Sequence, residues 1–93
     1  MAGYIISKSA QADLIKIAKY GDENYGIERS NQYRDRLKEQ FEILAHNPKL
    51  YRERWELSPP MRVCPYESHV ILYTVQQGQT IIVRVRHARE DWS

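Results

Sequence analysis

Residues 68–87 read SHVILYTV, QQGQ and TIIVRVRH, and this stretch decides the fold. Its first and last parts are rich in β-branched and aromatic residues, and the connector holds the only glycine of the region, so we predict two strands joined by a tight turn. Successive side chains of a strand point to opposite faces of a sheet. In the second strand, the residues that alternation places on one apolar face, which we expect to be buried, are Ile81, Val83 and Val85. The opposite face then carries Ile82 and a cationic stripe formed by Arg84 and Arg86.

Upstream of this hairpin, apolar or small residues recur at helical spacing in two runs. They are Ala10, Leu14, Ile17, Ala18 and Gly21 in the first run, and Tyr33, Leu37, Phe41, Leu44 and Ala45 in the second. We predict a first helix from Ser9, acting as N-cap, to Tyr25, with Gly26 as its C-cap or the following turn. The second helix begins near Ile27 and ends before Pro48. Two helices with so short a connector form an antiparallel hairpin, whose apolar surface can cover the sheet.

Three further segments complete the expected sheet. Tyr4–Ser7 is a short N-terminal strand candidate, and a short extended piece is expected within residues 51–57. Met61–Glu67 is the outer strand, because Pro65 has no N–H and belongs at an edge or a bulge. Helices followed by strands predict a single α+β domain over residues 1–93. We expect the helical hairpin to pack on a mostly antiparallel sheet that ends in a three-strand meander.

Composition excludes several classes of protein. The 93 residues carry a net charge of +2, which is too small for the whole chain to be a nucleic-acid binder. A single cysteine, Cys64, permits no internal disulfide and no cysteine metal site. We find no metal-ligand spacing, phosphate loop or serine nucleophile motif, and so expect no cofactor. No stretch approaches the ~20 apolar residues of a membrane helix. The N-terminus also lacks a signal-peptide pattern, so a cytoplasmic protein is expected.

Several local motifs, taken with the order of the elements, carry a resemblance to a known family. They are Ser9, Ala10, Asp13 and Leu14 at the first helix, Tyr20, Gly26, Leu44, Ala45, Asn47 and Pro48 around the second, Glu56, Leu57 and Arg62 near the strand entry, and the segments SHVILY at 68–73 and RVRHARED at 84–91. Together they resemble the ParE/RelE superfamily of toxins from type II toxin–antitoxin modules. The last segment looks like the ParE branch, which typically ends in a histidine-x-arginine segment.

The resemblance implies two alternative activities. ParE-like members are associated with poisoning DNA gyrase, whereas RelE-like members cut messenger RNA on the ribosome. RelE-like members typically have an arginine at the position that Val70 occupies here, counted back from Tyr73. Valine can neither donate a hydrogen bond nor hold charge, which favours a gyrase inhibitor that acts by binding over an enzyme. A ribosome-dependent endoribonuclease that uses Arg86 or His87 stays open, as does a non-toxic member that only binds an antitoxin.

The residues that we single out as a candidate toxicity surface are Arg62, Arg84, Arg86, His87 and Arg89. Arginine clusters suit phosphate or carboxylate groups, because the guanidinium is a planar and permanently charged fork. A solvated strand face is the alternative interpretation of Arg84 and Arg86. We expect His69 to pack against the sheet, and Asp13 to provide favourable charge near a helix N-terminus. No catalytic residue is assigned with this pattern.

The resemblance also implies a cognate antitoxin, ParD-like or similar, as partner. We expect a disordered antitoxin segment to fold onto the helical hairpin and the sheet edge. The candidate contacts, which the core stripes do not need, are Ile15, Tyr20, Ile43 and Trp55. Tyrosines and Trp55 could alternatively stack on bases. We expect no membrane partner and no sequence-specific nucleic-acid binding by this chain alone.

Overall fold

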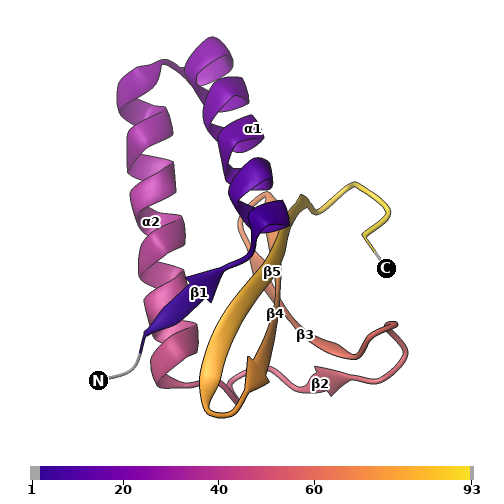
Figure 1. Cartoon of the computed structure of the whole chain (residues 1–93). Coiled ribbons are helices and arrows are strands. Elements are labelled where there is room, and N and C mark those ends of the chain that lie inside the picture. The colour runs from indigo at the N-terminus through magenta and orange to yellow at the C-terminus, as the bar shows by residue number, and fades with distance from the viewer. Residues whose placement is uncertain (1–2, 93) are drawn as a thin grey trace.

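The computed structural model describes residues 3–92, and in it two helices pack on one face of a five-stranded sheet (Figure 1). In chain order the elements are β1 (Tyr4–Ile6), α1 (Lys8–Tyr25), α2 (Ile27–His46), β2 (Glu53–Arg54), β3 (Met61–Tyr66), β4 (His69–Gln76) and β5 (Gln79–His87). The predicted α+β class, with its short N-terminal strand, helical hairpin and C-terminal meander, is confirmed. Among residues 3–92, no helix is long and apolar enough to cross a membrane.

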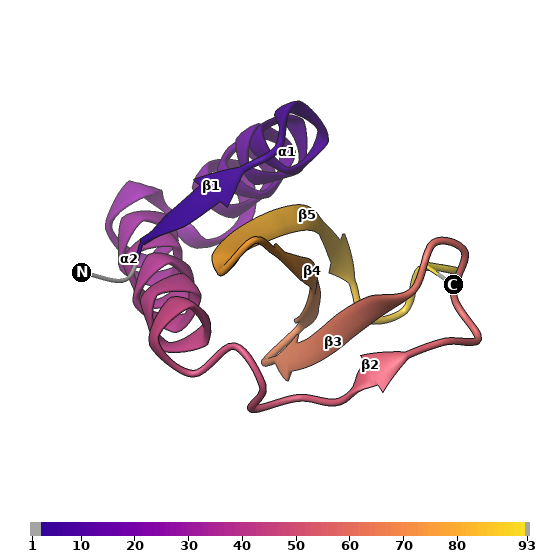
Figure 2. The ribbon, with the colours of Figure 1, turned by 60° about the horizontal axis from the view of Figure 1, so that its bottom comes forward.

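The sheet has the strand order β1-β5-β4-β3-β2. β1 runs parallel to β5, and every other neighbouring pair is antiparallel. Figure 2 shows how the sheet curves, with β1 and β5 beside the helices and β2 at the far edge. β2 pairs with Met61 and Arg62 of β3, so Pro65 lies beyond it, opposite Val70 of β4. A residue without an N–H is tolerated there, because the outer edge of β3 has no strand partner at that point.

A β-bulge in β5 overturns part of the predicted face assignment. Leu72 pairs with Arg84 but Tyr73 pairs with Ile82, which leaves Val83 as an extra residue. An extra residue shifts the alternation of side chains by one position. Consequently Ile82 is fully buried, and Val85 continues the same buried face on the other side of the bulge. The prediction that Ile82 lies opposite the buried face was wrong.

Apolar side chains form one core on each face of the sheet. The larger core lies between the sheet and the helices and contains Ala10, Leu37, Phe41, Leu44, Cys64, Ile71, Tyr73, Ile82 and Val85. The smaller core lies on the opposite face and contains Leu57, Val63, Val70 and Leu72, with Met61 and Trp92 packed against it. The larger core joins α1 and α2 to β3, β4 and β5, and it therefore fixes the position of the helical hairpin on the sheet.

The start of α1 is tied to β5 by Ser7, which is the N-cap in place of the predicted Ser9. Its hydroxyl accepts a hydrogen bond from the Ala10 N–H at 3.0 Å and donates one to the Val83 carbonyl at 2.8 Å. Its own N–H donates to the Ile82 carbonyl at 2.9 Å. Ser7 is the better N-cap because its hydrogen bonds also satisfy carbonyl groups of β5 just beyond the end of β1. Gly26 ends α1 with a φ of 87°, as glycine readily does.

Candidate functional site

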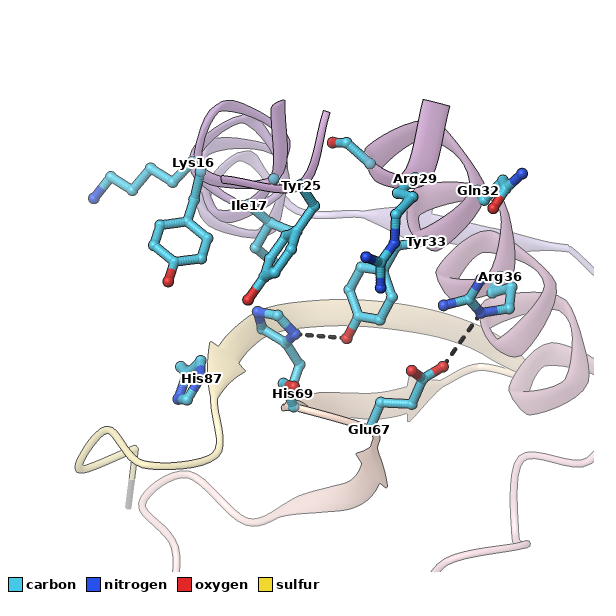
Figure 3. Close-up of a pocket in the computed structure, with 14 residues that line it drawn as sticks. Lys16, Ile17, Tyr25, Arg29, Gln32, Tyr33, Arg36, Glu67, His69 and His87 are labelled. Carbon is cyan, nitrogen blue, oxygen red and sulfur yellow. Dashed lines mark hydrogen bonds and ion pairs between the residues drawn. The ribbon is translucent and has the colours of Figure 1, made fainter. Parts of the chain in front are cut away.

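A cleft of about 770 Å³ lies between the turn of the helical hairpin and the end of the sheet where β4 begins and β5 ends. The hairpin extends past the sheet at this end (Figure 1). Figure 3 shows side chains from α1 and α2 on one side of the cleft, and side chains from the sheet on the other. The aromatic residues that line it are Tyr20, Tyr25, Tyr33, His69 and His87, and the basic and acidic ones are Lys16, Arg29, Arg36 and Glu67.

The floor of the cleft is a line of three polar rings. The Tyr33 hydroxyl lies 2.6 Å from Nδ1 of His69, within hydrogen-bond distance. His69 is in turn packed edge-on against His87, with 5.5 Å between ring centroids. Burial, together with the nearby Glu67 carboxylate, raises the pKa of Tyr33 to about 12. Burial and then His87 lower the pKa of His69, so we expect both groups to be uncharged at neutral pH.

The cations of the cleft differ in their partners. Arg36 forms an ion pair with Glu67, at 3.2 Å between Nε and Oε2, and lies over the Tyr33 ring. Arg29 lies over the Tyr25 ring, with 5.6 Å from Cζ to the centroid. Among the described residues, neither Arg29 nor Lys16 has a carboxylate partner. These two charges are therefore available to an anion from outside.

Next to the cleft, Asp13 of α1 binds the edge of β5. Its carboxylate accepts hydrogen bonds from Arg84 Nε at 2.7 Å and Arg84 Nη2 at 2.9 Å, and from the Val85 N–H at 3.0 Å. Burial by itself would raise the pKa of Asp13, but these donors outweigh it and the pKa lies below its usual range. The expected role of Asp13 near a helix N-terminus was wrong, because this side chain is a buried partner of Arg84.

A tight turn follows β5 and engages the next arginine. Glu90 accepts a hydrogen bond from Arg86 Nη2 at 2.6 Å and another from the His87 N–H at 2.9 Å. The hydrogen bond from the His87 N–H, and then Arg86, lower the pKa of Glu90, although desolvation of the carboxylate opposes this shift. Arg86 Nε is buried and has no hydrogen-bond partner among residues 3–92. Arg84 and Arg86 are therefore both charge-compensated within the chain.

The structure brings together four of the five residues of the predicted toxicity surface. Arg84, Arg86, His87 and Arg89 lie at the end of β5, and of these Arg89 is exposed, with no carboxylate partner for its guanidinium in the described chain. Arg62 lies apart from them. It pairs with Tyr73, four positions along β4 from His69, and donates to the Tyr51 carbonyl at 2.6 Å.

The four predicted antitoxin contacts are all exposed, but they do not form one patch. The exposed fractions are 70% for Ile15, 60% for Tyr20, 45% for Ile43 and 74% for Trp55. Tyr20 alone lines the cleft, where it packs edge-on against Tyr25. Ile43 lies near the other end of α2, and Trp55 follows β2.

The helical spacing of apolar residues predicts that Tyr33 belongs to the core stripe of the second helix, and it predicts no role for Arg29 or Arg36. Arg29, Tyr33 and Arg36 follow one another at spacings of four and three, which puts them on one face of α2. That spacing was a usable signal for a shared surface. Nothing in the local sequence, however, indicates that His69 and His87 lie opposite this face. Among the described residues, no group of three histidine, cysteine or acidic side chains could hold a metal ion.

Comparison with known proteins identifies the family. Residues 4–92 match the model of the ParE toxin of the type II toxin–antitoxin system, parDE. The chain belongs to the ParE toxin family. Toxin ParE1 of Mycobacterium tuberculosis is 34% identical over 89 residues, which cover 95% of this chain and 91% of that protein. Toxin ParE1 of Caulobacter vibrioides is 33% identical over 88 residues, which cover 94% and 90%.

A solved structure shows the same fold. The chain superimposes with a TM-score of 0.80 on a solved protein chain from the chromosomal ParDE toxin–antitoxin system of P. aeruginosa. The two sequences are 20% identical, and the superposition covers 94% of this chain and 96% of the solved one. The superposition spans the helical hairpin and the sheet, and so it extends to the elements that form the cleft. The predicted membership of the ParE branch is confirmed.

Proposed function

We propose that this ParE-family protein inhibits DNA gyrase by binding, in the cytoplasm, and that a ParD-like antitoxin neutralises it. The observation that carries the proposal is the place of Val70. Its side chain is 5% exposed and lies in the smaller core with Leu57, Val63 and Leu72. The position where RelE-like nucleases typically place an arginine is thus filled here by a buried apolar group.

The remaining arginines also support binding over RNA cleavage. Cutting RNA requires cations that stabilise the charge that develops on the phosphate. Arg84 and Arg86 are held by Asp13 and Glu90, so much of their charge is already compensated. His87, the last residue of β5, and Arg89, just beyond it, are left as groups through which a large protein target could be recognised. Charged groups on such a surface mainly set specificity and association rate.

The exposed apolar residues of the helices support an antitoxin partner. Ile15 and Tyr20 on α1 and Ile43 on α2 leave apolar surface in water, which an amphipathic antitoxin segment would cover. Binding that requires the folded toxin stabilises it, so the complex should melt at a higher temperature than the free toxin. Co-purification with the small protein encoded next to it, and the shift in melting temperature, test this part.

A supercoiling assay with purified gyrase tests the target directly. We expect the purified protein to inhibit supercoiling, and the antitoxin to restore it. Conditional expression in a bacterium should induce the DNA-damage response and filamentation while early translation continues. Immediate arrest of translation, with cuts in translated messages, would instead support the ribosome-dependent nuclease. Harmless overexpression of a protein that still binds its antitoxin would support a non-toxic member.

A further inference from the structure

We propose that the cleft between the hairpin turn and the sheet binds a nucleotide unit, with the base against the aromatic side chains and the phosphate at Arg29 (Figure 3). This site adjoins the surface at the end of β5, to which we assign the proposed action on gyrase, and the two share His87. Its ligand could be a free nucleotide or a nucleotide within a single strand, since both present the same base and phosphate.

The size of the cleft suits such a ligand. A volume of about 770 Å³ lies within the range of small-molecule sites, roughly 300–1,000 Å³. The helical side and the sheet side face each other across it, so a flat ligand can contact both. The core does not fill this space, because the hairpin extends past the end of the sheet (Figure 1).

The aromatic lining provides surfaces for a base. Tyr20 and Tyr25 pack edge-on with 6.2 Å between ring centroids, and they remain 60% and 55% exposed. Tyr33 from α2 and His69 from the sheet complete the lining, and we expect both to be uncharged at neutral pH. Aromatic faces bind bases of any sequence, because every base has a π-face. The hydrogen-bonding groups of Gln32 and Ser68, also in the lining, are available to the edge of the base.

The charges provide a place for a phosphate. Arg29 has no carboxylate partner in the described chain, and Figure 3 shows it extending from α2 toward the cleft, whereas the amine of Lys16 points away from it. A smaller hollow of about 120 Å³ shares Lys16, His69 and His87 with the cleft, and Arg86 lines it. Arg86 therefore adds positive charge beside the cleft, although its Nε is itself buried.

The same cations could attract an acidic peptide, but the aromatic lining favours a nucleotide. Acidic side chains gain from charge alone, and the rings of Tyr20, Tyr25 and His69 offer them little. A nucleotide uses both the rings and the charges, as single-stranded nucleic-acid binders do. The proposal therefore predicts that base and phosphate are both needed for binding.

Isothermal titration calorimetry on the purified full chain tests this. The probes are guanosine 5′-monophosphate, guanosine, inorganic phosphate, triglutamate and a guanosine trinucleotide. We expect the monophosphate to bind at least about tenfold more tightly than guanosine or phosphate, since stacking and charge-assisted bonds each contribute on this scale. Arg29→Gln should weaken it by about tenfold. Lys38→Gln is the matched control, since Lys38 is exposed on α2 and outside the cleft.

Each result of the titrations either supports or overturns the proposed nucleotide site. Absence of binding at millimolar monophosphate overturns the proposal, as does equal affinity in Arg29→Gln and Lys38→Gln. Phosphate or triglutamate that binds as tightly as the monophosphate overturns it too, and would assign the cleft to anions or to an acidic peptide. A trinucleotide that binds more tightly than the monophosphate supports a single strand as the source, and weaker binding supports a free nucleotide. Gyrase inhibition is measured separately and can survive or fail independently.

Discussion

Asp13 and Arg84, 71 residues apart in the chain, form a two-pronged ion pair that joins α1 to the edge of β5. β1 pairs with β5 only as far as Ile82, so the β5 backbone beyond it needs other partners. Ser7 binds the carbonyls of Ile82 and Val83, and Asp13 binds the N–H of Val85. The first turns of α1 therefore continue the pairing that β1 begins, and they hold the cationic end of β5 in place.

Replacing Asp13 with asparagine should destabilise the fold by about 2 kcal/mol, because it leaves Arg84 without a counter-charge beside a partly buried edge. The figure is below that of a fully buried pair, since the Arg84 side chain is 37% exposed. Urea unfolding of wild type and variant measures this difference in the free energy of unfolding. Asp22→Asn, an exposed change on the same helix, should stay within about 0.5 kcal/mol of wild type.

The interaction energy between Asp13 and Arg84 can be measured apart from the other effects of replacing each side chain. In Asp13→Asn with Arg84→Gln, both charges are gone, so the double variant should lose less stability than the two single losses added together. Strict additivity would contradict a direct interaction between the two side chains.

The pKa of Asp13 makes the same pair sensitive to acid. Its folded-state pKa is lowered, so near pH 4 the unfolded chain binds more protons than the folded one, and stability rises with pH there. The contribution is present above the unfolded value of about 4 and is lost as pH falls through the folded value. Urea unfolding from pH 6 down to pH 3 should therefore show a shallower loss for Asp13→Asn than for wild type. Glu90 is unchanged in both proteins, so its own lowered pKa cancels in the comparison. Parallel curves would contradict this role of Asp13.

The fold was predictable because its signals are local. The helical stripes, Gly26 and the turn before β5 each act within a few residues, and all of them appear in the structure. The site was less predictable because it depends on long-range register. The extra residue Val83 changes which side chains of β5 face the helices, and no local sequence pattern indicates the bulge. Asp13 resembles a helix-end carboxylate until Arg84 is brought beside it from the far end of the chain.

The bulge gives a direct test of the corrected core. Ile82→Ala should cost about 3 kcal/mol, because the side chain is fully buried in the larger core and its removal leaves a cavity. Val83→Ala, at the extra position and only partly buried, should cost about 1 kcal/mol or less. Chemical denaturation of the two variants decides between the observed register and simple alternation, which predicts the opposite order.

Close packing of the hairpin predicts an unusual response to alanine at position 21. A Cβ on Gly21 would lie 2.6 Å from Ser30 Oγ and 3.1 Å from Ser30 Cβ. Ser30 is buried and its hydroxyl bonds the Ala18 carbonyl, so it has little room to move. Gly21→Ala should therefore lower stability by about 1–2 kcal/mol, although alanine is the better helix former. Thermal melting measures the loss, and a rise in melting temperature would contradict the close contact.

A change at Arg89, at the end of β5, should affect the proposed inhibition of gyrase without affecting the stability of the fold. Its guanidinium is exposed and has no carboxylate partner in the described chain, whereas Arg84 is tied to Asp13. If this end of the sheet meets gyrase, Arg89→Glu should weaken inhibition of supercoiling by about tenfold or more, because the change reverses a charge at the contact. Its melting temperature should stay near wild type, as expected for a surface change. Lys49→Glu, an equal charge reversal at an exposed position after α2, is the control and should inhibit normally. Full inhibition by Arg89→Glu would remove Arg89 from the target surface and direct attention to other exposed residues.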